Sequence, residues 1–377
     1  MSDRSSAWER QLTMAIEGLL AVPSDHETVR SAVLSDGAGS LQALADTLAQ
    51  LRERGISSLE IDLIEASDRF GVADELTRRH YDLVHVCSPN PAGVAALVIA
   101  RVLGVPTVGN YAGELSAAEH AAFYRQCRVV LSPSPGADIS MEQVGVEADR
   151  IVRWVPGVDQ RRFNPGRYDP AALGSGDWIR ETGSFIVLYA GGLGREQGTD
   201  LLAEAFLIAR DQDPRLHLVL AGRGPEEQKL RSRLGNAATF LGRVCADALA
   251  CLYASADLFI VPGGSDTFGH AMLEAQASGL PVLAVDAGAP AELIQSGRSG
   301  CLAPPDPQAL AGALRGLARR AAIRDRLATG GLFAARERTW ERSLALLARG
   351  YERALGYRLG DHLTQPAADV AEVSRAA

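Results

Sequence analysis

Short apolar runs alternate with helical patterns along most of this chain, and this alternation limits its fold more than any other feature. The runs VRSAVLS, SSLEIDLIEA, YDLVHVCSP and VPTVGNY are separated by segments such as LQALADTLAQLRERG and AGVAALVIARVLG. Strands of this kind, with Gly, Pro or Ser at their ends, are typical of parallel β-α-β units. The alternation begins again at FIVLYAGG and continues through LHLVLAGRG, ADLFIVPGG and LPVLAVDAG. It predicts an α/β protein with two successive doubly wound, Rossmann-like domains, which bind ligands beyond the carboxyl ends of their strands.

The length of 377 residues fits two domains of ordinary size. The Pro-, Gly- and Asp-containing stretch FNPGRYDPAALGSGDW, residues 163–178, predicts a linker. We expect the following segments: an N-terminal helical extension at 1–27, a first Rossmann-like domain at 28–160, a second at 161–340, a C-terminal helix at 341–357 and a flexible tail at 358–377.

The charged residues exclude several classes of function. The formal net charge is −8, so nothing global attracts nucleic acid. The chain has 37 arginines and a single lysine, Lys229, which excludes a G-x-x-x-x-G-K-[ST] phosphate loop and leaves little room for Schiff-base chemistry. Lys229 lies in EEQKLRSRLG, a pattern typical of an exposed helix face.

Five scattered cysteines without a C-x-x-C pair argue against a disulfide framework or a zinc site, and no other spacing suggests metal ligands. The N-terminus lacks the pattern of a signal peptide, and no apolar run is long enough to cross a bilayer. We therefore expect a cytoplasmic protein. Apolar residues from Trp8 to Leu20 predict an amphipathic helix with a mixed polar face, which favours packing on the protein body over peripheral contact with a membrane.

The densest group of chemically useful residues is PGGSDTFGHAMLEAQASGLPV, residues 262–282. A Gly-rich loop after a strand leads here into a helix that we expect to begin near Thr267 or Phe268, and free N–H groups at such a start bind anions. Asp266 lies before this start and Glu274 lies after it, so both can reach a ligand there. The alternative is that Asp266 is an N-cap and Glu274 a surface residue.

The same segment resembles the retaining family-4 (group 1) glycosyltransferases of the GT-B fold, especially the bacterial type related to mannosyl- and sulfoquinovosyl-transferases. Their pattern E-x-x-x-x-x-x-x-E, with F-G and L-E-A-x-A-S-G-x-P-V, appears here as SDTFGHAMLEAQASGLPV, with aspartate in the first acidic place, a variant familiar in part of the family. YAGGLGREQGTDLLAEAF, LVLAGRGPEE, VLSDGAGS and RWVPGVDQRRFNP also match. The resemblance covers about residues 28–356 and implies two Rossmann-like domains facing a central cleft.

The resemblance implies roles for individual residues. Glu274 would accept hydrogen bonds from the nucleotide ribose, Asp266 would hold hydroxyls of the transferred sugar, and both are counted as catalytic. On the acceptor side it implies Tyr111 and Glu114. For the donor site it implies Gly37, Gly39, Gly191, Gly192, Arg195, Gly222, Arg223, Leu241, Gly242, Arg243, Val244, Thr267, Phe268, Gly269, His270 and Glu274. No metal and no cofactor would be needed, and the partners would be a nucleotide sugar and an unidentified acceptor.

This chain departs from the family where cations are expected. Gly192 and Gln197 stand where an arginine and a lysine usually grip the diphosphate, and Ala112 replaces a histidine near the reacting centre. Arg195 would either substitute for the missing arginine or remain a solvated loop residue. His270 would either point into the cleft or fill space at its wall.

Three functions are left open. The first is a retaining glycosyltransferase that acts in bacterial glycan or glycolipid biosynthesis. The second is a relative with impaired catalysis that binds a nucleotide sugar or a protein, and the third, with less support, is a nucleotide-sugar epimerase. Among the other residues, we expect His85 to be a satisfied core or interface residue, and Trp340 to anchor the C-terminal helix, which in this fold crosses back to the first domain.

Overall fold

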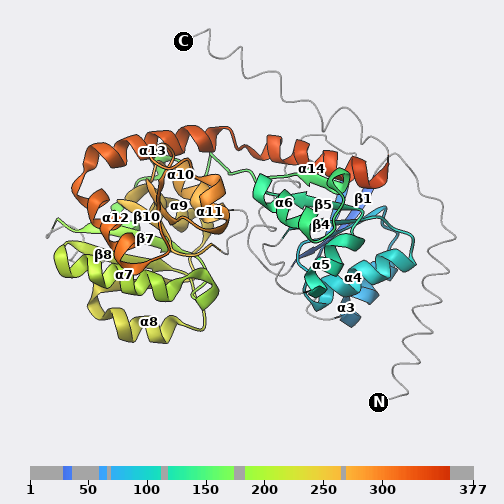
Figure 1. Cartoon of the computed structure of the whole chain (residues 1–377), viewed down its shortest axis with the longest axis horizontal. Helices are drawn as coiled ribbons and strands as arrows, with labels where there is room; N and C mark the ends of the chain where they lie inside the picture. Colours follow the sequence, from blue (N-terminus) through green and yellow to red (C-terminus); the bar gives the residue numbers. More distant parts are fainter. Residues whose placement is uncertain are drawn as a thin grey trace, which may run out of the picture. The chain divides into compact units, whose positions relative to one another are not determined.

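The computed structural model describes residues 29–35, 59–65, 69–111, 118–173, 183–264 and 269–356. These residues form two compact units, each built on a parallel sheet with helices on its faces (Figure 1). The first unit takes the chain up to Val155 and resumes at Glu341, and the second runs from Pro156 to Trp340. The chain therefore leaves the first unit five residues before the boundary expected at 160.

The sheet of the first unit has six strands in the order β2-β1-β3-β4-β5-β6, all parallel. Its strands are β1 (Val29–Ser35), β2 (Leu59–Glu65), β3 (Leu83–Val86), β4 (Thr107–Asn110), β5 (Val129–Ser132) and β6 (Ile151–Arg153). Its helices are α3 (Arg69–Arg78), α4 (Pro91–Val102), α5 (Ala118–Gln126), α6 (Pro135–Gln143) and α14 (Trp340–Leu355). The direction of strand order reverses between β1 and β3, which defines the ligand-binding edge in this class of sheet.

Two helices of this unit begin with the same local device. The side chain of Asn90 accepts a hydrogen bond from the N–H of Gly93 and precedes Pro91, and Ser134 does the same for Ala137 before Pro135. A short polar cap followed by proline satisfies orphan N–H groups and fixes φ for the first turn.

Helix α14 packs on the first unit, although it follows the whole second unit in sequence. The side chain of His85, in β3, is fully buried between the Tyr351 hydroxyl and the Asn110 amide, with both hydrogen bonds at 2.9 Å. Gly350 lies against Leu131, where a Cβ would come within 2.7 Å of Cδ2. The expectation that His85 is a satisfied interior residue is confirmed, and Trp340 at the helix start is buried.

The sheet of the second unit also has six parallel strands, in the order β9-β8-β7-β10-β11-β12. Its strands are β7 (Phe185–Ala190), β8 (Leu216–Ala221), β9 (Ala238–Gly242), β10 (Leu258–Val261), β11 (Val282–Val285) and β12 (Cys301–Ala303). Its helices are α7 (Thr199–Gln212), α8 (Glu227–Leu234), α9 (Ala246–Ser255), α10 (His270–Ala277), α11 (Gly288–Leu293), α12 (Pro307–Arg319) and α13 (Ala321–Arg336).

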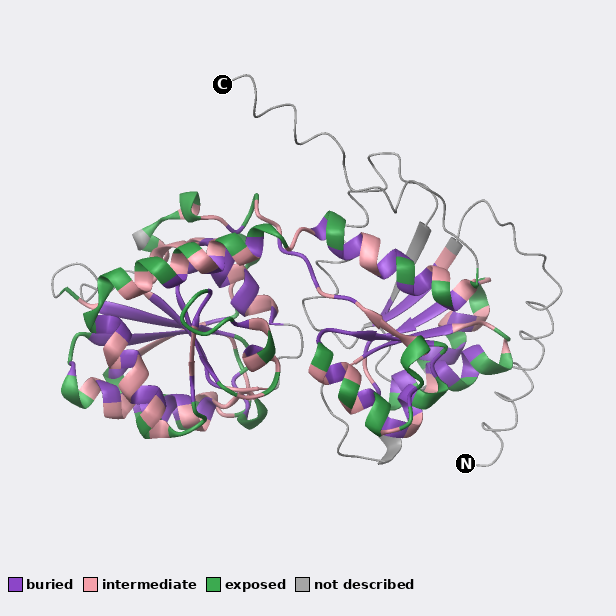
Figure 2. Ribbon diagram, turned by 45° about the horizontal axis from the view of Figure 1, so that its top comes forward, coloured by how far each residue is buried: buried purple, intermediate pink, exposed green. Residues whose placement is uncertain are grey.

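Apolar helix faces cover this second sheet on both sides, which leaves its four central strands, β7, β8, β10 and β11, purple in Figure 2. Alternate residues of β7 divide between two cores: Val187 packs with side chains of α7, α8 and α12, and Leu188 with side chains of α9 and α10. Burial on both faces explains why FIVLYA and LHLVLA are almost continuously apolar. The two doubly wound sheets predicted from the sequence are confirmed.

The prediction of a linker at 163–178 is wrong for the part of it that the structure describes. Phe163 is buried against Tyr253 of α9, and the N–H of Asp169 donates to the Ser255 hydroxyl at 2.8 Å. Arg167 also pairs with Asp247 at 3.2 Å. Proline, glycine and aspartate here form two short 3-10 turns that pack on α9.

Candidate functional site

The candidate site lies where the strand order of the second sheet reverses. Strands β7 and β10 pair side by side there, and the connections that follow them leave in opposite directions. Such a switch point is where open parallel sheets bind nucleotides, beyond the carboxyl ends of the strands. The loop of residues 191–198 follows β7, and the loop that begins at Pro262 follows β10.

Glycines allow these loops to touch backbone to backbone. A Cβ at Gly198, whose φ is 75°, would lie 2.4 Å from the carbonyl oxygen of Pro262. A Cβ at Gly222 would lie 1.8 Å from the carbonyl oxygen of Gly191, and one at Gly288 would lie 2.3 Å from that of Gly264. The carboxyl edge of β7, β8, β10 and β11 is therefore a continuous surface of close-packed main chain. Gly198, Gly264 and Gly288 were not among the predicted site residues, although each is the small residue of a turn that follows a strand.

Two helices start at this edge and point their amino ends toward it. Helix α7 begins at Thr199 after Gly198, and α10 begins at His270 after Gly269, which has φ of 64°. The expected start near Thr267 or Phe268 is wrong, because a residue in the left-handed region cannot continue a helix. The partial positive charge at both helix starts favours an anionic ligand.

Of the predicted residues around α10, the structure describes three. Gly269 is buried, and His270 and Glu274 are half-buried. Glu274 is the fifth residue of α10, so its carboxylate is carried little more than one turn from the helix start. Asp266, Thr267 and Phe268 lie outside the described residues.

The two positions that lack the expected cations lie against each other. A Cβ at Gly192 would be 3.5 Å from Oε1 of Gln197, an ordinary van der Waals distance. The Tyr189 hydroxyl donates to the Gly192 carbonyl at 2.6 Å, and the Thr199 hydroxyl donates to the Gly194 carbonyl at 2.9 Å. This turn is thus held by uncharged groups.

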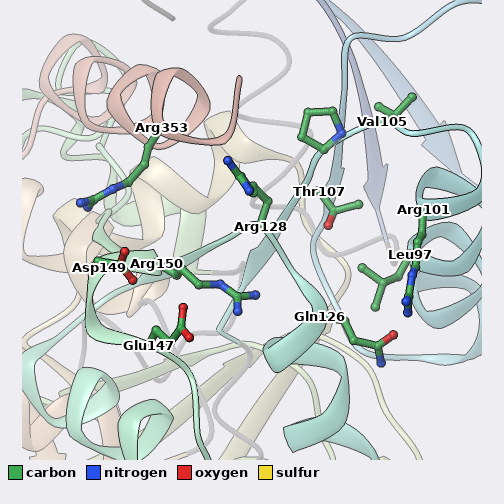
Figure 3. Close-up of a pocket in the computed structure, with 11 residues that line it drawn as sticks. Leu97, Arg101, Val105, Thr107, Gln126, Arg128, Glu147, Asp149, Arg150 and Arg353 are labelled. Carbon is green, nitrogen blue, oxygen red and sulfur yellow. The ribbon is translucent and has the colours of Figure 1, made fainter. Parts of the chain in front are cut away.

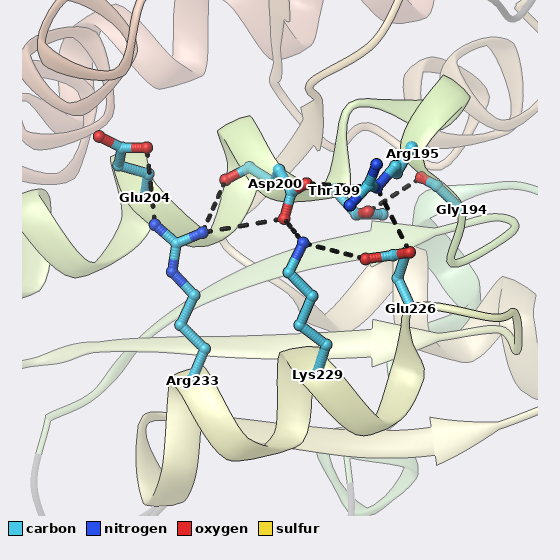
Figure 4. A network of polar contacts seen from close by, with 8 residues as sticks. All are labelled: Gly194, Arg195, Thr199, Asp200, Glu204, Glu226, Lys229 and Arg233. Carbon is cyan, nitrogen blue, oxygen red and sulfur yellow. Dashed lines mark hydrogen bonds and ion pairs between the residues drawn. The ribbon is translucent and has the colours of Figure 1, made fainter.

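Arg195 is engaged in a surface network of charges (Figure 4). Its Nε lies 3.6 Å from Glu226 and 4.0 Å from Asp200, and its side chain is 74% exposed. Lys229 binds the same two carboxylates at 3.0 Å and 2.5 Å. The hydrogen bond from Lys229 is the main cause that lowers the pKa of Asp200. Lys229 therefore lies on an exposed helix face, as the sequence indicates, and Arg195 shares its charge with acidic neighbours.

The predicted nucleobase-side residues meet at the ends of β8 and β9. The N–H of Gly222 donates to the Gly242 carbonyl at 2.8 Å, and a Cβ at Gly242 would lie 3.3 Å from Nε of Arg223. Leu241 and Val244 are half-buried, and Arg243 is exposed. The structure thus joins Gly191, Gly222 and Gly242 into one run along the sheet edge.

The predicted residues of the first unit are described only in part. Tyr111 directly follows β4 and stacks at a tilt on Tyr124, with ring centroids 6.0 Å apart. Gly37, Gly39 and Glu114 lie outside the described residues. Strand β1 ends at Ser35, so the chain segment that carries the two glycines follows the strand at the switch point of this sheet.

Two kinds of feature are absent from the described ranges. No group of three or more His, Cys, Asp or Glu side chains there is arranged to hold a metal ion. None of the helices in the same ranges is both long and apolar enough to cross a bilayer.

Comparison with known proteins shows which family this chain resembles. Residues 184–320 match the family described as "Glycosyl transferases group 1", and residues 32–162 match "Glycosyltransferase Family 4". The chain belongs to the group 1 and family 4 glycosyltransferases, and its two Rossmann-like domains have the GT-B fold. The resemblance inferred from its motifs is confirmed.

Individual relatives support the same assignment. The chain is 33% identical over 246 residues to a GDP-mannose-dependent alpha-mannosyltransferase of Corynebacterium glutamicum, in an alignment that covers 61% of this chain and 57% of that protein. It is 29% identical over 308 residues to a D-inositol 3-phosphate glycosyltransferase of Pseudarthrobacter chlorophenolicus, covering 74% and 72%. The chain thus spans less than two thirds of the length of the mannosyltransferases it matches.

A solved structure shares the fold. The crystal structure of Anabaena Alr3699/HepE in complex with UDP and glucose superposes with a TM-score of 0.68 at 19% identity. The superposition covers 86% of this chain and 99% of that one.

Proposed function

We propose that this protein transfers a sugar from a nucleotide-diphosphate sugar to an acceptor hydroxyl, with the donor bound at the switch point of the second unit. The observation that carries the proposal is the glycine-lined edge where the amino ends of α7 and α10 flank β7 and β10. The names of the relatives support it, since they include a GDP-mannose-dependent enzyme and a protein bound to UDP and glucose.

In this proposal, different residues bind the nucleotide, the transferred sugar and the acceptor. Glu274 accepts hydrogen bonds from the ribose as a bidentate carboxylate, and Asp266 holds hydroxyls of the transferred sugar. The main chain at Gly191, Gly222 and Gly242 lines the nucleotide at the sheet edge. In the first unit, Gly37 and Gly39 permit close approach of the diphosphate, and Tyr111 and Glu114 serve the acceptor.

The reaction proceeds with retention at the anomeric carbon and without a metal. The departing diphosphate is stabilised by main-chain N–H groups and by the dipoles of α7 and α10, and it helps to deprotonate the acceptor hydroxyl. Arg195 contributes only when it leaves Asp200 and Glu226.

A second candidate is a relative that binds a nucleotide sugar without efficient turnover. The specific observation in its favour is that Gln197 lies beside Gly192, while Arg195 is paired with carboxylates. Removal of one hydrogen-bond donor that stabilises the transition state slows such a reaction on the order of a hundredfold.

A product assay with the intact chain tests the proposal and separates the two candidates. GDP-mannose and UDP-glucose are supplied together with D-inositol 3-phosphate, the compound named for one relative, with and without EDTA, and the glycoside product is followed by NMR. The proposal expects release of nucleoside diphosphate, an axial product from an axial donor, and equal rates with EDTA. Binding without product would favour the second candidate, and inversion or loss of activity with EDTA would contradict the mechanism.

A further inference from the structure

The first unit contains a pocket at the opposite edge of its sheet from the proposed chemistry. Its volume is about 660 Å³, and Figure 3 shows the side chains that surround it. Thr107 begins β4, Arg128 directly precedes β5 and Arg150 directly precedes β6, so the pocket lies at the amino ends of these strands. Helix α14 contributes Arg353, and α4 contributes Arg101.

This position separates the pocket from the acceptor-side residues. Tyr111 follows the carboxyl end of β4, whereas the pocket is lined by Thr107 at the amino end of that strand, whose residues rise about 3.3 Å each. A ligand in the pocket therefore does not occupy the place of the sugar acceptor.

The arginines of the pocket are available for a ligand. Within the part of the chain that the structure describes, Arg101, Arg128 and Arg353 have no ion pair and no side-chain hydrogen bond, and all three are exposed. The fourth, Arg150, is fixed, because its guanidinium donates to the carbonyl oxygens of Arg125, at 2.8 Å, and of Cys127. The pocket thus combines one anchored and three free guanidinium groups.

Carboxylates line the same pocket. Glu147 and Asp149 are exposed, and neither lies within ion-pair distance of an arginine among the described residues. Four arginines against two carboxylates leave a net positive lining, which suits a dianion. The two carboxylates can accept hydrogen bonds from the hydroxyls of a ligand, and the amide of Gln126 can both donate and accept.

We propose that this pocket binds a phosphorylated sugar or polyol, with its phosphate on Arg128 and Arg353 and its hydroxyls toward Glu147 and Asp149. Guanidinium groups bind phosphate in a bidentate way, and the pocket is much larger than a single phosphate. Leu97 and Val105 supply an apolar wall for the carbon skeleton.

The ligand reaches the pocket free in solution or as the headgroup of a lipid. The second source is relevant because α4 exposes Val94, Val98 and Val102, at 41%, 53% and 56%. These positions share one helix face, and Arg101 lies directly beside them at the pocket rim. An apolar face next to a phosphate site suits the surface of an anionic bilayer.

Two binding measurements on the intact chain distinguish these sources. Glucose 6-phosphate is titrated by calorimetry, and co-sedimentation is measured with phosphatidylcholine vesicles that do or do not contain phosphatidylglycerol. The test variant is Arg128→Ala with Arg353→Ala. The matched control is Arg161→Ala with Arg349→Ala, which removes the same charge from exposed positions outside the pocket, one of them a turn away on α14.

The proposal expects at least one probe to bind, and the test variant to weaken that binding roughly tenfold or more while the control matches the wild type. If binding of glucose 6-phosphate depends on Arg128 and Arg353, the ligand is a free phosphorylated compound. If only binding of the anionic vesicles depends on them, the ligand is a lipid headgroup. Failure of both probes to bind, or an equal loss in the two double variants, would overturn the proposal.

Discussion

Gly198 illustrates how single residues fix the geometry of the candidate site. Its left-handed φ of 75° joins the turn after β7 to α7, and its missing Cβ leaves room for the carbonyl of Pro262. Gly297 has nearly the same φ, 76°, with nothing within 4 Å of the place a Cβ would take. Comparison of these two glycines therefore separates the cost of a left-handed backbone from the cost of a steric clash when a Cβ is added.

We expect Gly297→Ala to lower the free energy of unfolding by about 1 kcal/mol, from the left-handed conformation alone. Gly198→Ala should cost about 2 kcal/mol more, because the loops after β7 and β10 must separate. Urea denaturation of both variants measures the difference. Equal effects would show that the two loops do not depend on this contact.

Gly192 and Gln197 offer a direct test of the missing cations. Gly192 does not have a positive φ, and a Cβ there would make only ordinary contacts, so the backbone accepts a side chain. Gly192→Arg with Gln197→Lys should therefore fold and tighten nucleoside diphosphate binding by roughly tenfold or more, because each charge-assisted bond to phosphate contributes about 1.5–3 kcal/mol. Calorimetry checks this, and unchanged affinity would mean that these positions do not face the diphosphate.

At the scale of elements, a buried hydrogen bond of Tyr351 helps to hold α14 on the first unit. The carboxamide oxygen of Asn110 can only accept, so Nε2 of His85 carries the hydrogen and Nδ1 accepts from the Tyr351 hydroxyl. Tyr351→Phe leaves a buried acceptor without a partner and should cost about 1–3 kcal/mol of unfolding free energy. Tyr168→Phe, at a position that is 65% exposed, is the control and should change stability little. A similar small effect of both changes would contradict the role given to this bond.

The same histidine makes the stability of the first unit depend on pH. Burial lowers the pKa of His85 from 6.5 to about 4, so the unfolded chain binds a proton at a higher pH than the folded chain does. The contribution of neutral His85 to the free energy of unfolding is complete above pH 6.5. It is lost as the pH falls toward 4, and the total loss is about 3 kcal/mol. Denaturation at several pH values and NMR titration of the imidazole measure it. A His85 signal that titrates near 6.5 would refute this account.

Some strands and helices could be predicted from the sequence more accurately than others. Strands such as β7 and β8 were predictable because burial on both faces makes them continuously apolar. The sequence predicts the start of α10 too early, because the positive φ of Gly269 keeps the helix from beginning before His270, and residue type alone does not reveal this φ. The composition of the stretch from Phe163 is that of a loop and predicts a linker, whereas its packing depends on the distant residue Tyr253.

Side-chain partners were the least predictable part of the site. Arg195 is close in sequence to the position of the expected arginine, but its partners Asp200 and Glu226 lie on α7 and just before α8. Such pairing depends on how two helices approach one another, and no local pattern encodes it. The motif around Glu274, in contrast, was visible because its residues are contiguous.

At the scale of the whole molecule, two units of the same architecture have different ligand-binding features. The second unit has the close-packed glycine edge with two helix starts, and the first has an arginine-lined pocket at the amino edge of its sheet. Helix α14 returns to the first unit after the second is complete, so both units depend on one continuous chain. The proposed donor site is therefore best tested in the intact protein.

Binding of nucleoside diphosphates tests the central claim most directly. UDP and GDP are titrated by calorimetry into the wild type, Glu274→Gln and the control Glu204→Gln, whose carboxylate lies on the exposed face of α7 and pairs with Arg233 at 3.5 Å. The account predicts that the wild type binds at least one of them with a Kd of about 1 mM or tighter, that Glu274→Gln binds roughly tenfold or more weakly, and that Glu204→Gln matches the wild type. No binding of either nucleotide, or equal binding by Glu274→Gln and the wild type, would contradict it.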